Sequence, residues 1–315
     1  MTLKHPEKRY LIITVDTEGD NMWRSMFSRN SVEHRISIQN GKYLLRFQKL
    51  CEVYGFVPTY LVDYEMAGSE PLREMARTGV PAKRLEIGMH MHAWSTPPYY
   101  MFPPERDATH FNPYIGEYPT EIIEQKVDCL LSRLKDAFHL KHITSHRSGR
   151  WQLDARYVKI LQRHGIFADC SVTPGVDWSD QIGQTKDSGG SDYRAFPKTM
   201  YEMNLDDIQK SGRSGLFEVP VTIEMEDGKA SASWLRPTGR NLSQMLELVE
   251  RKSEEQVPYL EFMIHSAELM PFGSPTFPSE GAIEKLYQDM EQLFARLSKE
   301  YQGIGLSDYV REASV

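Results

Sequence analysis

The chain has 315 residues, of which 40% are hydrophobic and 26% charged, as in folded globular proteins and unlike disordered ones. Its 37 basic and 44 acidic residues give a net charge of −7, which argues against nucleic acid as a partner. Its three scattered cysteines are too few for a disulfide framework or a cysteine-based zinc site. We expect no membrane span, because no stretch approaches the roughly 18 apolar residues it needs. The first apolar run, Tyr10–Val15, is too short for a signal-peptide core, so we expect a cytoplasmic protein.

Short apolar runs alternate with helical patterns along the chain. The runs predict strands at Tyr10–Asp16, Phe56–Asp63, Leu85–His92, His142–Arg147, Ile166–Val172, Leu216–Ile223 and Tyr259–His265. Helix start signals follow at Ser69, Thr120, Asp154, Asn241 and Ser279, with the helix from Ser279 expected to run to Gly303. This order is typical of a mostly parallel sheet, open or closed into a barrel. We expect one catalytic domain over residues 1–315.

Two long stretches match no regular element. Residues 95–119 are rich in proline and aromatic residues, and residues 173–200 are rich in Gly, Ser and Asp. Loops of this length are uncommon in compact domains unless they form a lid or a binding rim, although a simple covering flap would look the same. Five aromatic residues here suit either stacking on sugar rings or packing within their own loops: Tyr99, Tyr100, Phe102, Tyr114 and Trp178.

Two polar clusters have the residue types of a metal site. Asp16 and Glu18 follow the first predicted strand, where alternation places both carboxylates on one face. His90 and His92 share a face of the third predicted strand, and paired imidazoles at this spacing can reach one zinc or similar ion. Each cluster alone would also fit a solvated strand end or structural histidines.

Two further strand ends carry candidate catalytic groups. Arg147 ends the fourth predicted strand, where a guanidinium can hold a carboxylate by paired hydrogen bonds and keep it ionised. His265 ends the last predicted strand, and its ordinary pKa of about 6.5 suits a general acid near neutrality. A surface salt bridge and a structural histidine are the alternatives.

In this order the strand-end clusters resemble the polysaccharide deacetylases of carbohydrate esterase family 4. The runs His265–Pro271 and Ser171–Trp178 are similar to deacetylase-like proteins of exopolysaccharide biosynthesis clusters. The resemblance spans about residues 10–275 and implies a distorted (β/α)7 barrel with one divalent metal at the strand ends. It also implies a carbohydrate substrate. From the imidazole and carboxylate ligand types we expect this metal to be zinc.

The resemblance gives each matching residue a role. Asp16 matches the catalytic base, Arg147 the arginine that orients this base, His265 the general acid and His90 the first metal histidine. The chain departs from the pattern at the usual second aspartate, which is Thr17 followed by Glu18, and at the usual second histidine, which is Trp94. Glu18 and His92 are the nearest substitutes as metal ligands.

Two further positions differ from the family pattern. The residue after the last histidine is Ser266, where the family usually has proline. Glu218–Val221 occupies the place of the family's fourth motif but does not have the residues of that motif.

Three functions fit these residues. A metal-dependent hydrolase that removes acetyl groups from an N-acetylated sugar, or from an O-acetylated one, needs a metal, a base and an acid. A carbohydrate-binding or regulatory protein with a degraded site would account for Thr17 and Trp94. A metal amidohydrolase of a small non-sugar amide would use the same groups. The sequence leaves the oligomeric state open.

Overall fold

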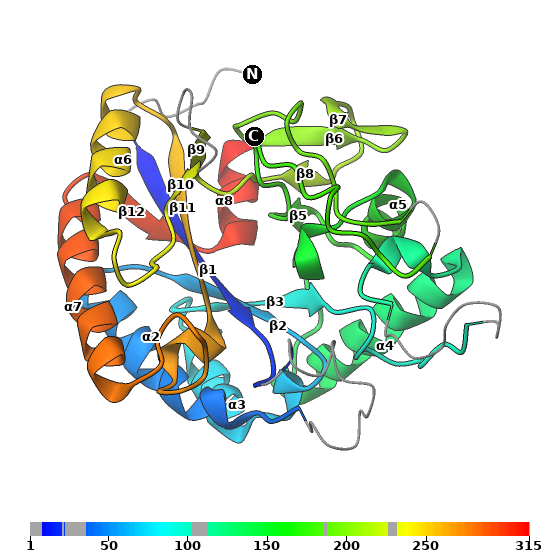
Figure 1. Ribbon diagram of the computed structural model, residues 1–315, viewed down its shortest axis with the longest axis horizontal. Helices are drawn as coiled ribbons and strands as arrows, with labels where there is room; N and C mark the ends of the chain where they lie inside the picture. The colour runs from blue at the N-terminus through cyan, green and yellow to red at the C-terminus, as the bar shows by residue number, and fades with distance from the viewer. Residues whose placement is uncertain are drawn as a thin grey trace.

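The computed structural model describes residues 8–20, 22, 36–102, 112–185, 188–225 and 232–314. A curled, mostly parallel sheet runs through the middle of the molecule (Figure 1), in the strand order β11-β1-β2-β3-β4-β5-β8-β6-β7. Its parallel strands are β1 (Arg9–Thr17), β2 (Pro58–Val62), β3 (Glu86–Met91), β4 (Ser145–Ser148), β5 (Ala168–Asp169), β8 (Phe217–Glu218), β11 (Tyr259–His265) and β12 (Tyr301–Ile304). The antiparallel strands β6 (Tyr201–Asn204) and β7 (Asp207–Ser211) extend one edge of the sheet. All seven predicted strands are therefore present, and the expected distorted barrel is confirmed.

Helices cover the outside of the sheet and bury its apolar side chains. They are α2 (Leu44–Val53), α3 (Glu70–Gly79), α4 (Thr120–Phe138), α5 (Ala155–Arg163), α6 (Leu242–Glu254), α7 (Glu280–Leu297) and α8 (Leu306–Ala313). In Figure 1, α6 and α7 lie along one side and α4 and α5 along the other. Two helices begin at a capping side chain: Asp154 accepts the Tyr157 amide at 2.7 Å and Ser279 accepts the Ala282 amide at 3.1 Å. Each bond satisfies a backbone donor that has no partner within the helix.

The barrel is not closed by strand pairing between β8 and β11. A short antiparallel hairpin of β9 (Ile223–Met225) and β10 (Ala232–Trp234) lies at this seam. The Glu261 amide of β11 donates to the Thr222 hydroxyl at 2.8 Å, and the Met263 amide donates to the Leu235 carbonyl at 3.3 Å. These bonds satisfy backbone donors on the free edge of β11, which would otherwise be unpaired.

The structure corrects the predicted end of the chain. The helix that begins after Ser279 stops at Leu297 instead of Gly303, and Tyr301–Ile304 forms β12. This strand pairs with the first half of β1, while β2 pairs with the second half along the same edge. Hydrogen bonding of Tyr301–Ile304 to β1 therefore ends the helical pattern that begins at Ser279. The predicted strands Ile166–Val172 and Leu216–Ile223 are also shorter, because only two residues of each pair with a neighbour at this end of the sheet.

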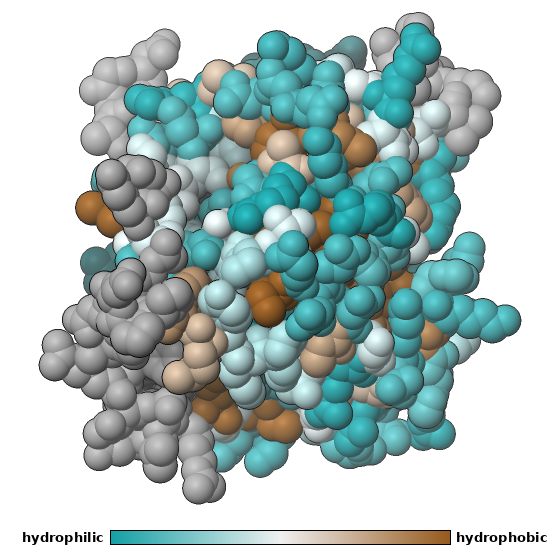
Figure 2. Space-filling model, turned by 90° about the vertical axis from the view of Figure 1, so that its right-hand side faces the viewer, coloured by the Kyte–Doolittle hydropathy of each residue, from teal (hydrophilic) through white to brown (hydrophobic). Residues whose placement is uncertain are grey.

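Among the described residues, no helix is long and apolar enough to cross a membrane. Figure 2 shows one face of the molecule, on which hydrophilic side chains predominate and hydrophobic ones form separate small spots. Scattered apolar side chains of this kind are normal on a folded protein and need no binding partner to explain them.

Candidate metal centre and active site

Strand register brings the predicted site residues to one end of the sheet. Asp16 of β1 lies opposite His265 of β11, and His90 of β3 lies opposite Arg147 of β4. All these strands are parallel, so their carboxyl ends meet at the same edge, where α/β enzymes place their sites. The structure therefore brings together residues that are far apart in the sequence.

Arg147 lies under the site with no exposure to solvent. Its guanidinium donates to Asp16 Oδ1 at 2.7 Å, to the Cys170 carbonyl at 2.9 Å, and to Glu261 Oε1. Burial acts to raise the pKa of Asp16, but Arg147 and then the imidazoles of His90 and His265 outweigh it and lower this pKa. Asp16 is consequently a buried carboxylate that stays ionised near neutrality.

Glu18, His90 and His92 form a buried cluster whose ligand atoms lie within 4.8 Å of one another. Glu18 Oε2 is 2.7 Å from His92 Nε2 and 3.5 Å from His90 Nε2. Burial acts to raise the pKa of Glu18, but the nearby imidazoles of His265, His90 and His92 hold it well below its ordinary value. Two imidazole nitrogens and one ionised carboxylate oxygen are the donor set of an open, three-ligand metal site.

The hydrogen bonds around His90 fit a metal at this position. His90 Nδ1 lies 3.0 Å from the Arg147 carbonyl, which can only accept, so Nδ1 carries the proton. In the neutral ring the lone pair is then on Nε2, which faces the Glu18 carboxylate. A lone pair opposite an anion is unfavourable unless a cation or a proton lies between them. A carbonyl behind the ring is also a common way to orient a metal-binding histidine.

His265 lies beside this cluster with a side chain that is 13% exposed. Its Nε2 is 3.7 Å from Asp16 Oδ2 and 4.0 Å from Glu18 Oε1. On the other side of the ring, Nδ1 is 3.3 Å from Glu268 Oε2 and 3.1 Å from Arg236 Nη2. Burial and Arg236 act to lower the pKa of His265, but Glu18 and Glu268 outweigh them and raise it. A raised pKa is in the direction that a proton donor requires.

Several residues that hold the site have no strong signal in the sequence. Asn40 donates to the Glu18 carbonyl at 2.7 Å, and the Ser266 hydroxyl accepts the Glu18 amide at 3.1 Å. Asp63 accepts the Gly19 amide at 2.8 Å. These bonds fix the backbone on both sides of Glu18. Ser266 thus directly supports the backbone of Glu18, at the position where the resembling family commonly has proline.

The structure shows what surrounds the residues that depart from the family pattern. The Thr17 hydroxyl donates to the Val15 carbonyl at 2.9 Å and is not part of the cluster. Trp94 is buried and its ring centroid lies 4.5 Å from that of His92, so it packs against a candidate ligand. Glu218 is fully buried and accepts the Val172 amide at 2.8 Å. It is a structural group below the site, and burial raises its pKa well above the ordinary value.

Of the five aromatic candidates in the two long loops, four pack against other side chains and one is exposed. Tyr100 and Phe102 pack against Tyr118, with centroid distances of 6.3 and 5.1 Å. Tyr114 is buried below Arg150, whose guanidinium lies 4.8 Å from its ring. These three side chains pack within the protein, whereas Tyr99 is 70% exposed. The fifth, Trp178, packs on Trp234 with centroids 6.4 Å apart.

Comparison with known proteins identifies the fold. A scan against protein-family models finds no match, and a search of curated proteins finds none. Among solved structures, a Mycobacterium smegmatis protein provisionally named a polysaccharide deacetylase matches all of this chain and 93% of its own, with a TM-score of 0.64 and 13% identity. The fold is that of the polysaccharide deacetylases.

A second structure with this deacetylase-type fold comes from Parabacteroides distasonis and is provisionally named a glycoside hydrolase/deacetylase. It matches 97% of this chain and 71% of its own, with a TM-score of 0.63 and 10% identity. Identities this low show the fold alone. An activity for this polysaccharide deacetylase fold has to be argued from the residues of its own site.

Proposed function

We propose that the protein is a metal-dependent deacetylase that removes the acetyl group from an N-acetylated sugar, or from an O-acetylated one. The observation that carries this proposal is the position of Asp16 and His265. Both lie beside the buried cluster of Glu18, His90 and His92, and their side chains are 3.7 Å apart. A base, an acid and a metal cluster at one strand end are the groups that amide hydrolysis requires without a nucleophilic serine or cysteine.

The metal would be held by Glu18, His90 and His92. We propose zinc, because two imidazoles and one carboxylate leave the open fourth position of a catalytic zinc site. When bound, the ion would polarise the substrate carbonyl and make a water molecule more acidic. Support for the geometry comes from Glu18 Oε2 and His90 Nε2. Their separation of 3.5 Å is close to the edge of about 3.3 Å expected for a tetrahedron with bonds of about 2.0 Å. The 2.7 Å between Glu18 Oε2 and His92 Nε2 is shorter than this edge and corresponds to a direct hydrogen bond, which a bound ion would replace.

The remaining steps belong to the chain's own residues. Asp16, kept ionised by Arg147, accepts the proton of the attacking water at its Oδ2 oxygen. His265, whose pKa Glu18 and Glu268 raise, donates a proton from Nε2 to the departing nitrogen. Glu268 accepts both the His265 backbone amide at 2.9 Å and the ring, so the imidazole is held in one orientation. Arg147 and Glu268 are positioning residues, since each acts through its neighbour.

The biological setting is a further part of the proposal. The runs His265–Pro271 and Ser171–Trp178 support a role in exopolysaccharide biosynthesis, because they are similar to deacetylase-like proteins of such gene clusters. The substrate would then be a precursor or polymer of that pathway class.

The experiment that tests this function measures acetate release by the zinc-loaded protein from N-acetylated and O-acetylated oligosaccharides. We expect His90→Ala to lose the metal by elemental analysis, and Asp16→Asn to keep most of it while losing turnover. His265→Ala should slow amide cleavage by roughly 10²–10⁴-fold and spare an activated ester, whose leaving group needs no proton. Full metal content in His90→Ala would refute the ligand assignment.

A carbohydrate-binding protein without activity is the second candidate. The observation that favours it is Thr17, whose hydroxyl bonds to the Val15 carbonyl where the resembling family supplies a carboxylate ligand. Absence of acetate release from every acetylated sugar by the metal-loaded protein, with sugar binding retained, would favour this reading over the deacetylase.

A further inference from the structure

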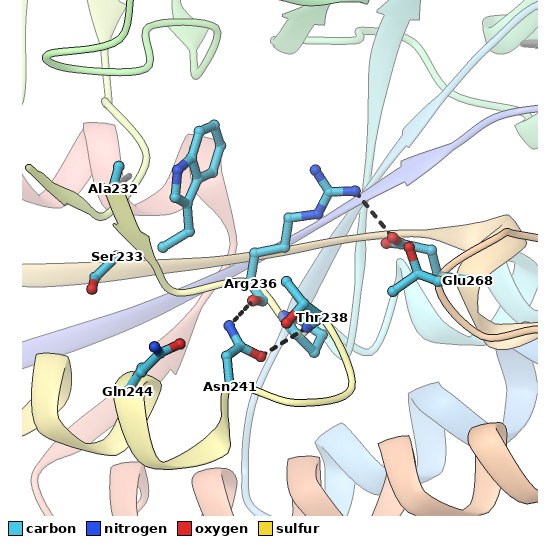
Figure 3. A pocket seen from close by; sticks show the side chains of 10 residues that line it. Ala232, Ser233, Arg236, Thr238, Asn241, Gln244 and Glu268 are labelled. Atoms are coloured by element: carbon cyan, nitrogen blue, oxygen red, sulfur yellow. Dashed lines mark hydrogen bonds and ion pairs between the residues drawn. The ribbon is translucent and has the colours of Figure 1, made fainter. Parts of the chain in front are cut away.

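A pocket of about 270 Å³ lies next to His265, between β10, the turn after it and the first turn of α6 (Figure 3). Trp234, Arg236, Asn241, Gln244 and Glu268 are among its lining residues. Two of these, Arg236 and Glu268, also contact the His265 ring. This β10–α6 pocket therefore lies beside the proposed active site, and two of its lining side chains contact the proposed acid.

The polar lining of the β10–α6 pocket is preformed and balanced in charge. Figure 3 shows the Arg236 guanidinium turned toward Glu268, with which it forms an ion pair of 3.0 Å. Asn241 fixes the turn, because its oxygen accepts the Thr238 amide at 2.8 Å and its nitrogen donates to the Arg236 carbonyl at 2.8 Å. Gln244 adds an exposed amide from α6. Such a lining suits an uncharged ligand with several hydroxyl groups, since an anion would have to compete with Glu268 for Arg236.

The aromatic lining connects the pocket with Arg147. Trp234 packs edge-on against Trp151 and Trp178, with centroids 6.1 and 6.4 Å away. Trp151 in turn lies 5.0 Å from the Arg147 guanidinium, directly below Asp16. All three tryptophans are half-buried, and Trp234 is the one that lines the pocket. Large aromatic rings beside polar groups are common in sites for ligands that have both apolar and polar faces.

We propose that the β10–α6 pocket binds one neutral pyranose unit, adjacent to the unit whose acetyl group is removed. The C–H face of this ring packs on Trp234, and its hydroxyl groups bond to Gln244 and Arg236. The volume is near the lower end of ligand pockets, about 300 Å³, and so suits a single ring. This inference rests on the proposed function for the neighbouring unit, and it makes the substrate an oligosaccharide instead of a monosaccharide or a small non-sugar amide.

Binding of unacetylated sugars tests the pocket without using catalysis. The probes are the β-1,4-linked and the α-1,4-linked glucose tetramers, titrated calorimetrically into the zinc-loaded protein. We expect one of them to bind with a Kd on the order of 1 mM, as for one weakly held ring. Gln244→Ala should raise this Kd about fivefold through loss of one hydrogen bond, and Trp234→Ala about tenfold. Gln209→Ala, which removes an exposed glutamine from β7, is the control and should not change it.

The outcomes separate this inference from the deacetylase proposal. Failure of both tetramers to bind, or equal binding by wild type and Gln244→Ala, overturns the pocket. Gln244 is an exposed helix residue, so this variant keeps the test valid if Trp234→Ala does not fold. Tetramer binding that depends on Gln244, without acetate release from any acetylated sugar, supports the pocket and removes the deacetylase function. Acetate release without tetramer binding supports the deacetylase function and overturns the pocket.

Discussion

Replacing Arg147 with methionine tests how the site keeps Asp16 ionised. The side chain has no exposure to solvent and donates to Asp16, Glu261 and the Cys170 carbonyl. Methionine fills similar space but donates nothing, so two buried carboxyl groups lose their cation. Removing one partner of a buried ion pair typically costs about 3–5 kcal/mol. We expect a loss of this size in the free energy of unfolding near neutral pH.

This loss should depend on pH. Arg147 lowers the pKa of Asp16, while Glu261 already has its pKa raised to about 7, mainly by burial. Without Arg147 burial raises the pKa of both groups, so the folded variant binds more protons than the unfolded chain between about pH 4 and neutrality. Its stability then falls as pH rises through this range. The difference from wild type should be largest at about pH 8 and smaller at about pH 5.

Urea unfolding at both pH values measures the effect. Arg77→Met is the matched control, because Arg77 pairs with Glu74 at 2.7 Å on a side chain that is 68% exposed. An exposed pair of this kind is worth about 0–1 kcal/mol. A loss below about 1 kcal/mol for Arg147→Met, or an equal loss at both pH values, would refute the reasoning.

Three further predictions concern other parts of the structure. A Cβ atom on Gly149 would lie 2.5 Å from His92 Nδ1, so Gly149→Ala should weaken zinc binding at least about tenfold in a competition assay with a chelator; unchanged affinity would contradict this. The pKa of Glu268 is lowered to about 2, because Arg236 and His265 outweigh its burial. Glu268→Gln should therefore lose about 2–3 kcal/mol above about pH 5, and this loss should shrink as the pH falls toward 2; a loss that grows on acidification would disprove the assignment. Lys126 is buried and donates to two backbone carbonyls of the loop after β3. Lys126→Met should lose about 1–3 kcal/mol in urea unfolding, whereas a more stable variant would show that burying the ammonium costs more than these bonds return.

The central strands could be predicted because buried strands consist of continuous runs of apolar residues. All residues of β1 except Arg9 are buried, which gives the continuous apolar pattern typical of a parallel strand. α5 was equally accessible to prediction, since Asp154 is a capping residue next to an amphipathic run. β12 was not, because its four residues form a strand only through their pairing with β1.

The site was predictable where its residues end strands and unpredictable where they act from elsewhere. Asp16, His90 and His265 follow apolar runs, so the rule that sites lie at strand ends finds them. Glu261 lies inside β11, and nothing in that run shows that its charge faces Arg147 across the barrel. Arg236 lies in the turn after β10, where a lone arginine resembles any surface residue. Only the folded arrangement gives these two residues their neighbours.

The position of β1 has a consequence for the order in which the protein forms. This first strand pairs with β11 along most of its length and with β12 along its first half, and the bond between Thr14 and Glu261 joins residues 247 positions apart. Contacts of such long range form late, because a large loop must be closed before they can be made. During synthesis, the apolar residues of β1 therefore leave the ribosome long before β11 and β12 do. We expect the emerging chain to need protection by chaperones until β11 has been made.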